Sequence, residues 1–378
     1  MKRKINAKVA FSLAVMCSFL CFSSCGEKNM KLSDIVDFVL EVESGRNVRI
    51  LQLTDIQIID GAQCRTEERL PDTYKEIWAI ENIQTLAWQY MDWAVRETSP
   101  DLIVLTGDNV YGEFDDSGTS LRLLIDQMDG YGIPWTLTYG NHDNETALGA
   151  RWQNQQFVNA KNCMFARGID EAEGNGNFTI GITQEGKLTE VLYMLDSHGC
   201  VNLSSEERVH SEKGILEGQK QWYASVSSKL KSYNGGENVK SLGFFHHPLR
   251  AFGDGLRKYG YTSLKNDFYD TPGNWKPFSV VEIGIKNDEG DWGIVNEDCD
   301  FIDNDYGFFN LLLENGTEGV FFGHNHTNAA SVEYQGIRLT YGVKSSGYDS
   351  HHEGLLGGTL IQIGENSFDV SPYFHKKE

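Results

Sequence analysis

The sequence lacks several features that would indicate other classes of protein. It contains no internal repeat and no low-complexity tract, which argues against solenoids, propellers and fibrous chains. Its seven cysteines form no C-x-x-C pair, which argues against a zinc knuckle. After the first 24 residues there is no further long hydrophobic run, so no later segment predicts a membrane span.

Basic side chains are also scarce. The chain has 33 Lys and Arg against 54 Asp and Glu, which gives a net charge of −21. This balance argues against nucleic acid or an anionic membrane surface as the main partner, because both are themselves negative. A phosphate-binding site in such a chain would need its own local positive charge, and bound metal ions supply that.

The first residues predict an export signal. A cationic stretch precedes an apolar run from Val9 to Phe22, and Ser23-Ser24 then leads into Cys25. The run is too short to span a bilayer, so residues 1–24 are typical of a cleaved signal peptide. The Ser-Ser-Cys ending resembles a bacterial lipoprotein signal. That resemblance implies a lipid on Cys25, a tether over 25–36, and an exported, membrane-anchored protein in the periplasm or on the cell surface. The alternative is an ordinary secretory signal cut near Ser24.

Residues 37–378 predict one domain of mixed α/β, or α+β, class. Short, wholly apolar runs such as 102–106 are typical of parallel strands buried on both faces. Helical spacing over 75–98, 121–131 and 219–231 alternates with them. The runs at 38–42 and 48–53, separated by Ser44-Gly45-Arg46-Asn47, predict a hairpin.

The order of these elements predicts a two-sheet β-sandwich flanked by helices, because the later part of the sequence is rich in strands. The segment 254–305 is polar and only weakly periodic. Long segments of this kind in compact domains are usually functional or disordered, and we expect an insertion over the site.

Five short polar clusters share one context, since each directly follows a short apolar run. They are Asp55 and Gln57 after ILQLT, Asp108 after LIVLTG, Asn141 and His142 after TLTYG, His246 and His247 after LGFF, and His324 and His326 after VFFG. Taken singly, each cluster is explained by a core residue or a helix cap. Strand ends of α/β sheets, however, are where loops converge on a ligand site, so five clusters in this context indicate one site.

These clusters combine carboxylate, amide and imidazole groups, which together make a good ligand set for divalent and trivalent metal ions. The two oxygens of a carboxylate such as Asp108 can bridge two cations. Two ions roughly 3.5–4 Å apart can clamp both the attacking and the leaving oxygen of a phosphoryl displacement. The residue types therefore predict metal-assisted phosphate chemistry.

The order D-x-Q, GDN, GNHD, H-x-P, GHxH resembles the calcineurin-like metallophosphoesterase superfamily. The segments LDS at 195–197, GQKQW at 218–222 and SSGY at 345–348 resemble, more narrowly, its purple acid phosphatase-like branch. The resemblance runs from about residue 48 to about residue 370. It implies a metallophosphoesterase-like sandwich with two metal ions, divalent or mixed-valence and drawn from Mn, Fe, Zn and Mg.

The resemblance also implies roles for individual residues. The first ion would be held by Asp55, Gln57, Asp108 and His326, and the second by Asp108, Asn141, His246 and His324. His142 would protonate the leaving oxygen or stabilise charge, which suits a group that titrates near neutral pH. The resemblance assigns no role to the neighbouring His247, which is a candidate contact of metal or substrate.

Two positions depart from the family pattern. Many members carry histidine at the position of Gln57, and an amide oxygen is the weaker ligand, which should loosen the first ion or favour Mn, Mg or Fe over Zn. Tyr111 lies three residues after Asp108, a spacing at which purple acid phosphatases bind iron(III) through tyrosinate. The alternative for Tyr111 is a packed, hydrogen-bonded side chain.

The expected function is hydrolysis of a small phosphate ester, most simply a phosphomonoester. The alternatives are a phosphodiesterase acting on nucleotides or lipid head groups, and a non-catalytic binding lipoprotein of the same fold. A zinc-capturing protein is a third, with His351-His352 as its cue. Lys344, Tyr348 and Trp292 are candidate substrate contacts. The substrate itself and the oligomeric state are not indicated by the sequence.

Overall fold

The computed structural model describes residues 30–65, 69–169, 173–199, 201–202, 209–210, 212–262, 278–280, 285–302, 305–365 and 367–376. The predicted signal peptide 1–24, Cys25 and the first part of the tether 25–36 lie outside the described residues. The predicted domain therefore starts close to the first residues that the structure describes.

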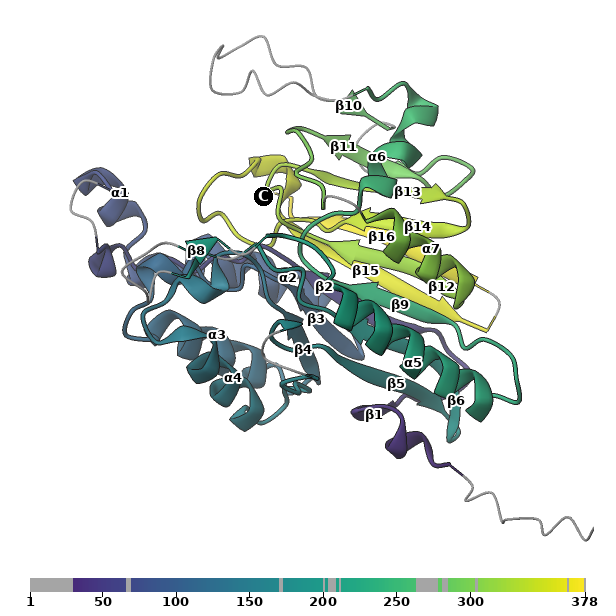
Figure 1. The fold of residues 1–378 in the computed structure, drawn as a ribbon. Coiled ribbons are helices and arrows are strands. Elements are labelled where there is room, and N and C mark those ends of the chain that lie inside the picture. Colours follow the sequence, from purple (N-terminus) through teal and green to yellow (C-terminus); the bar gives the residue numbers. More distant parts are fainter. Residues whose placement is uncertain are drawn as a thin grey trace, which may run out of the picture.

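Two mixed β-sheets pack face to face and carry helices on their outer faces (Figure 1). The order of the larger sheet is β1 (Phe38–Glu41), β5 (Phe178–Gln184), β6 (Lys187–Met194), β9 (Ser241–Phe244), β12 (Thr317–Phe322), β14 (Ile337–Tyr341), β13 (Ala329–Tyr334), β11 (Trp292–Val295) and β10 (Phe278–Ser279). The order of the smaller sheet is β16 (Ser367–Phe374), β15 (Gly357–Gly364), β2 (Val48–Leu53), β3 (Leu102–Thr106) and β4 (Trp135–Thr138). A separate ribbon pairs β7 (Val201–Asn202) with β8 (Val209–His210).

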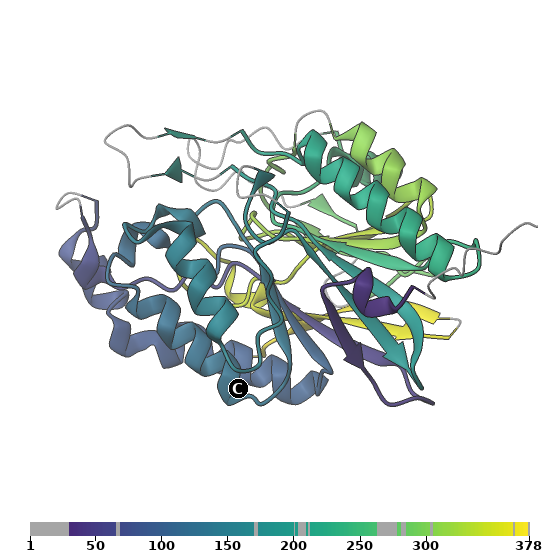
Figure 2. The ribbon, with the colours of Figure 1, turned by 60° about the horizontal axis from the view of Figure 1, so that its bottom comes forward.

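The helices form two outer layers, with the sheets between them in Figure 2. Those of the first half of the chain are α1 (Asp72–Ile77), α2 (Gln89–Thr98), α3 (Thr119–Gly130) and α4 (Gly149–Asn159). Those of the second half are α5 (Glu217–Tyr233), α6 (Arg250–Leu256) and α7 (Tyr306–Glu314). Helix α2 packs on β2 and β15 of the smaller sheet, whereas α6 and α7 pack on β12, β13 and β14 of the larger one.

Strand alternation explains the two hydrophobic cores. In β6, Leu192 and Met194 belong to the core between the sheets, while Val191 and Tyr193 belong to the core under α5, α6 and α7. Because neighbouring side chains on a strand point to opposite faces, a strand that is apolar throughout is buried on both sides. The wholly apolar runs of the sequence are therefore the central strands, as predicted.

The predicted hairpin of 38–42 and 48–53 is wrong. Strands β1 and β2 do form there, but β1 pairs in parallel with β5 of the larger sheet, and β2 pairs with β3 and β15 of the smaller one. The turn between them carries the chain from one sheet to the other. The partner of β1 lies about 140 residues further along the chain, beyond the reach of a local pattern.

The predicted helix over 75–98 is interrupted. Helix α1 ends at Ile77, Ala79 is extended, and α2 begins only at Gln89 after a π-helical turn over Gln84–Trp88. The side chain of Asn82 donates to the carbonyl of Ile77 at 2.9 Å, so it occupies an acceptor that a continuous helix would have used.

The segment 254–305 is only partly an insertion. Its described residues include β10 and β11, which extend the larger sheet, and Asp291 and Trp292 are fully buried. Residues 263–277, 281–284 and 303–304 lie outside the described part. Because the segment is polar overall, the sequence pattern did not predict the buried strand β11 within it.

Candidate metal centre

The five polar clusters come together at one end of the sandwich. Asp55 lies two residues beyond β2, Asp108 two residues beyond β3 and Asn141 three residues beyond β4 in the smaller sheet. His246 and His324 lie two residues beyond β9 and β12 in the larger sheet. The carboxyl ends of strands from both sheets thus meet around a single centre, as expected for α/β proteins.

The backbone at this centre is held in an unusual conformation. Asp55 has a φ of 51°, Gln57 of 45°, Asp108 of 49° and His324 of 81°. Positive φ costs free energy in residues other than glycine and persists only where the surrounding structure enforces it. Such outliers cluster at functional sites, and here they coincide with predicted ligand positions.

The glycines of the motifs permit close approach. A Cβ atom on Gly140 would overlap the Asp108 side chain, and one on Gly323 would overlap that of Asp55. The glycine that precedes the ligands in GNHD and GHxH is therefore required by the packing of one loop against another.

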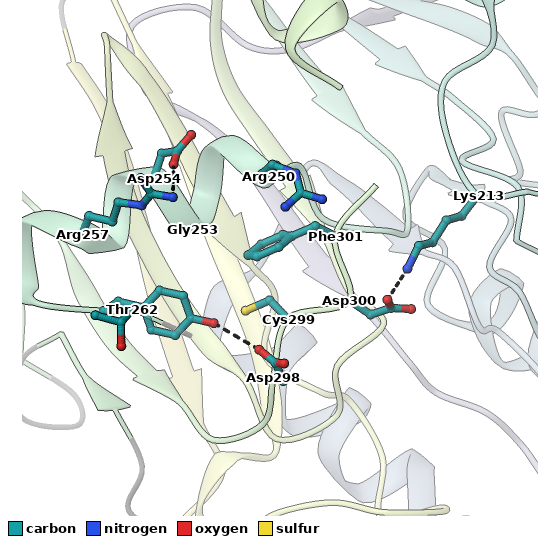
Figure 3. A pocket seen from close by; sticks show the side chains of 11 residues that line it. Lys213, Arg250, Gly253, Asp254, Arg257, Thr262, Asp298, Cys299, Asp300 and Phe301 are labelled. Atoms are coloured by element: carbon teal, nitrogen blue, oxygen red, sulfur yellow. Dashed lines mark hydrogen bonds and ion pairs between the residues drawn. The ribbon is translucent and has the colours of Figure 1, made fainter. Parts of the chain in front are cut away.

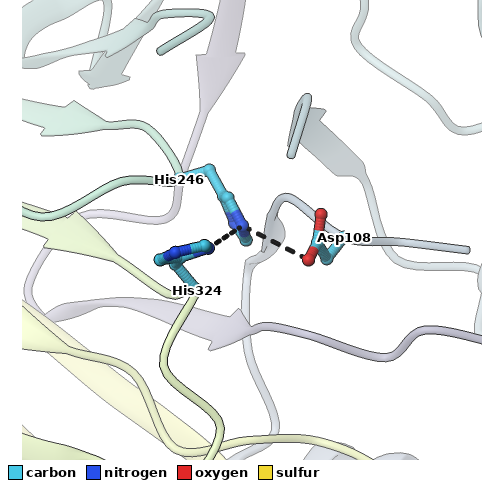
Figure 4. Close-up of side chains that lie close together, drawn as sticks. All are labelled: Asp108, His246 and His324. Atoms are coloured by element: carbon cyan, nitrogen blue, oxygen red, sulfur yellow. Dashed lines mark hydrogen bonds and ion pairs between the residues drawn. The ribbon is translucent and has the colours of Figure 1, made fainter. Parts of the chain in front are cut away.

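The donor group predicted for the second ion comprises Asp108, Asn141, His246 and His324. Nε2 of His246 lies 3.1 Å, and Nδ1 of His324 lies 3.0 Å, from the same amide oxygen of Asn141. These two nitrogens are 3.3 Å apart, and Nε2 of His246 is 3.4 Å from a carboxylate oxygen of Asp108 (Figure 4). Convergence of this kind is typical of ligands directed at one cation.

The donor group predicted for the first ion includes Asp55, Asp108 and His326, whose ligating atoms all lie within 4.8 Å of one another. Nε2 of His326 is 3.9 Å from an Asp55 oxygen. Asp108 belongs to both groups and is fully buried, so its carboxylate lies between them. The residue arrangement fits two adjacent ions with Asp108 shared.

A further test of that fit is the hydrogen-bond partner of the outer nitrogen of each histidine, meaning the ring nitrogen that does not face the other donor atoms. Nδ1 of His246 faces the carbonyl of Thr106 at 2.9 Å, Nε2 of His324 faces Asp300 at 3.2 Å, and Nδ1 of His326 faces Ser350 at 2.8 Å. Metal-binding histidines characteristically use one ring nitrogen in this way, which fixes the tautomer and leaves the other nitrogen for the ion. All three histidines follow this pattern.

Neighbouring imidazoles favour the ionised form of the Asp108 carboxyl. Burial works against ionisation of Asp108, but His246 and His142 hold the pKa of its carboxyl well below its usual range. The loop of Asp108 is fixed by Asp143, which accepts from the backbone of Asn109 at 2.8 Å and of Gly140 at 2.7 Å. Asp143 thus ties two ligand loops together, a role that the sequence did not reveal.

Gln57 lies beside Asp108, as predicted, but its amide oxygen faces elsewhere. Oε1 accepts from the Lys344 ammonium at 3.0 Å, while Nε2 points to a carboxylate oxygen of Asp108 at 3.2 Å. Lys344 is fully buried against the centre rather than exposed to a substrate.

His142 is supported from two sides. Its Nδ1 lies 2.8 Å from Oε2 of Glu145, and its ring packs on that of Tyr111 with centroids 4.0 Å apart. Burial opposes a charged ring, yet the carboxylates of Asp108 and Glu145 raise the pKa of His142 to about 9. The raised pKa favours the protonated ring, which is the form that can donate a proton.

Tyr111 is a packed, hydrogen-bonded residue. Its hydroxyl accepts from the guanidinium of Arg69 at 3.0 Å, and its side chain is buried. Burial and nearby carboxylates raise the pKa of the Tyr111 phenol. This is the alternative to tyrosinate ligation that the sequence left open.

His247 belongs to neither of the two donor groups. Its Nδ1 lies 3.2 Å from the hydroxyl of Ser197, and its ring packs beside His324 with centroids 4.3 Å apart. Together with Asp300 and His324 it forms a third cluster, which shares His324 through the outer nitrogen of that ring.

A pocket of about 360 Å³ adjoins the centre at Asp300 (Figure 3). One carboxylate oxygen of Asp300 contacts His324, and the other pairs with the ammonium of Lys213. Arg250 and Asp298 also line this pocket. It therefore brings polar side chains of both signs next to the predicted metal ligands.

Two other sequence expectations fail. Trp292 is buried and donates from Nε1 to the carbonyl of Val370 at 2.9 Å, and Tyr348 is buried in the core, so neither is placed to contact a substrate.

Cys64, Cys163 and Cys299 are not joined in disulfides in the part of the chain that the structure describes, and Cys200 lies outside it. Among the described residues, no helix is long and apolar enough to cross a membrane.

Comparison with known proteins agrees with this geometry. The chain is 26% identical over 327 residues to the probable inactive purple acid phosphatase 29 of Arabidopsis thaliana, which covers 82% of this chain and 74% of that protein. It is 28% identical over 229 residues to the phosphatase DCR2 of Saccharomyces cerevisiae, which covers 56% of this chain and 36% of that protein.

A solved dimetal phosphatase from Danio rerio has the same fold, with a TM-score of 0.51 at 13% identity; the match covers 86% of this chain and 96% of that one. The sequence profile described as calcineurin-like phosphoesterase matches residues 48–328, which include both donor groups. This chain belongs to the calcineurin-like phosphoesterase family.

Proposed function

We propose that the protein is a metal-dependent phosphomonoesterase with a centre of two metal ions. The observation that carries the proposal is the meeting of two donor groups at the shared carboxylate of Asp108. When bound, two such ions would activate water as the nucleophile and stabilise the charge that develops on the phosphoryl oxygens.

The chain itself would contribute positioning and proton transfer. Asp55, Asp108 and His326 would hold one ion, and Asp108, Asn141, His246 and His324 the other. His142 would donate its proton to the leaving oxygen from Nε2, because Glu145 occupies Nδ1. Tyr111 would keep the His142 ring in place by packing on its face.

The pocket beside Asp300 would receive the leaving group. Its charges are largely paired with one another, since Lys213 contacts Asp300 and Arg257 lies 3.2 Å from Asp254. A wall of balanced charge suits a compact polar alcohol better than a chain of further phosphates. The alternative is a phosphodiester of a nucleotide or a lipid head group, whose leaving group is also an alcohol, and the substrate panel below separates the two.

The competing function is binding without catalysis, and the name of the Arabidopsis relative, probable inactive purple acid phosphatase 29, is the reason to consider it. Against it stands the retention of polar donors at every expected ligand position, together with His142 and its partner Glu145. A chain kept only for binding would not need a protonated imidazole held beside the centre.

A substrate panel tests the proposal. The purified protein would be depleted of metal, reloaded separately with Mn²⁺, Zn²⁺, Fe²⁺ or Mg²⁺, and assayed on an aryl phosphate, a sugar phosphate and a bis-aryl phosphodiester. We expect monoester turnover to exceed diester turnover with at least one metal. Metal binding without any turnover would favour the binding function, and faster diester turnover would favour the phosphodiesterase.

We further propose that the protein is exported and anchored through a lipid on Cys25. The support is the sequence alone, in which a single cysteine follows a small-residue pair at the end of a short apolar run. A Cys25→Ser variant should move from the detergent-soluble membrane fraction to the soluble exported fraction. Unchanged fractionation would indicate ordinary secretion.

A further inference from the structure

Lys344 places a buried cation next to the first metal position. Its Nζ lies 2.7 Å from the carbonyl oxygen of Asp55 and 3.0 Å from Oε1 of Gln57, and the side chain is 1% exposed. The backbone fixes this position, because Thr54 and Lys344 form a parallel β-bridge and the Ser345 amide donates to the Thr54 carbonyl at 2.9 Å.

This contact determines which way the Gln57 amide points. An ammonium group only donates hydrogen bonds, so the atom of Gln57 that faces it must be the oxygen. The amide nitrogen is then the atom that faces Asp108, at 3.2 Å. The opposite orientation would set two donors against each other at Lys344 and two acceptors against each other at Asp108.

The orientation has a consequence for the first ion. An amide nitrogen has no free lone pair for a metal, so only the oxygen of Gln57 can bind one, and the hydrogen bond from Lys344 holds that oxygen away from Asp108. The first position then keeps three side chains, Asp55, Asp108 and His326. The second position has four, with Asn141 in addition to its carboxylate and two histidines.

The positive charge of Lys344 also weakens binding of the first ion. Asp55 and Asp108 are the carboxylates that would attract the first ion, and Lys344 lies beside both, since its Nζ contacts the Asp55 carbonyl and the Gln57 amide that reaches Asp108. A fixed positive group there competes with a bound cation for the same negative charge.

We propose that Lys344 withholds the Gln57 oxygen from the first metal ion and makes that ion the weaker-bound and more readily exchanged of the two. This inference rests on the two-metal centre proposed above. It also assigns Gln57 a conditional role, as a ligand that becomes available only when Lys344 is removed.

A double-mutant cycle tests the inference through binding rather than activity. Full-length protein in detergent would be depleted of metal and titrated with Mn²⁺ by calorimetry, with free Mn²⁺ followed by electron paramagnetic resonance. We expect wild type to bind two ions with separated affinities. Gln57→Ala should change the weaker Kd by less than about 3-fold, and Lys344→Met should tighten it by about 10-fold or more.

The decisive measurement is the double variant. If Gln57 becomes a ligand once Lys344 is gone, Gln57→Ala in the Lys344→Met background should remove most of the gained affinity. Lys344→Gln, which removes the charge but keeps a polar side chain, replaces Lys344→Met if that variant does not fold. Lys240→Met is the matched control, because Lys240 pairs with Glu318 away from the centre, and it should leave both affinities unchanged.

Two outcomes would overturn the inference. One is a loss of about 10-fold or more in the weaker affinity on Gln57→Ala alone, which would make Gln57 a ligand in the wild-type protein. The other is an unchanged weaker affinity in Lys344→Met with two ions still bound. Absence of Mn²⁺ binding by the wild-type protein would instead overturn the proposed metal centre itself.

Discussion

Nδ1 of His142 lies 2.8 Å from Oε2 of Glu145, three residues further along the chain. The carboxylate fixes the proton on Nδ1 and leaves Nε2 as the nitrogen that can act on a substrate. The buried carboxylate of Glu145 and the stacked ring of Tyr111 together hold the imidazole in one orientation. This arrangement gives His142 the properties of a general acid.

Replacing His142 with alanine should lower the hydrolysis rate by roughly 10²–10⁴-fold, the usual range for a lost general acid. Metal content, measured by elemental analysis, should stay at the wild-type level because His142 belongs to neither donor group. The loss should shrink for esters with a good leaving group, which need less protonation. A variant that loses its metal would show that His142 is a ligand.

Replacing Glu145 with glutamine should lower the rate in the same way but less, by roughly 10-fold or more, since the imidazole remains and only its orientation and charge are disturbed. The double variant His142→Ala/Glu145→Gln should be no slower than His142→Ala, because both residues act through one proton transfer. Multiplicative effects in the double variant would mean that Glu145 acts independently.

Replacing Asp108 with alanine should abolish turnover and release most of the bound metal, because Asp108 is the side chain shared by both donor groups. Asp126→Asn, an exposed carboxylate on α3, is a suitable control and should retain both metal and activity. Two metals per chain and near-normal rates in Asp108→Ala would rule out a shared carboxylate.

The protein should be colourless, and Tyr111→Phe should leave its visible spectrum unchanged. The Tyr111 hydroxyl is hydrogen-bonded to Arg69, and burial raises its pKa, so tyrosinate is not favoured. A violet preparation whose absorption disappears in Tyr111→Phe would show instead that the phenolate binds iron(III).

Asp291→Asn should destabilise the larger sheet by an amount on the order of 1–3 kcal/mol, measured by chemical denaturation, because it leaves buried partners without their charge. The fully buried carboxylate of Asp291 pairs with Arg338 and, at 2.6 Å, with Lys258. It also accepts from the Glu333 amide at 2.8 Å, which joins the start of β11 to β13.

The same residue predicts a pH dependence. Burial works against its ionisation, but Lys258, with Tyr259 and Arg338, lowers the pKa of the Asp291 carboxyl below its ordinary value. Its stabilising effect is therefore complete above the unfolded pKa of roughly 3.9 and is lost as the pH falls through the lower folded value. The stability difference between wild type and Asp291→Asn should shrink on acidification below that point, and a constant difference would contradict the assignment.

Much of the site was predictable because its signals are local. Short apolar runs such as LIVLT are typical of strands buried on both faces, and polar residues directly after such strands lie at strand ends. That rule predicts one site at these strand ends, whereas the grouping of Asp55 with His326, and of Asp108 with His246, was implied by the resemblance to the family.

The remaining features depend on long-range contacts that no local pattern encodes. Lys344 meets Gln57 across 287 residues, and β1 pairs with β5 across about 140 residues. Glu145 was missed for a different reason. An acidic residue shortly after GNHD has no distinctive spacing, and only its distance to Nδ1 identifies it as a partner of His142.

The backbone amide of His324 donates to both carboxylate oxygens of Asp55, a contact that closes a loop of 269 residues. Loops of this size close late in folding, because the entropy lost on closure is repaid only when the surrounding strands have paired. A nascent chain released before its last third is made would hold Asp55 and Asp108 without His324 and His326. Metal loading should therefore report completion of the whole fold, and the time at which the ions bind should coincide with the slowest folding step.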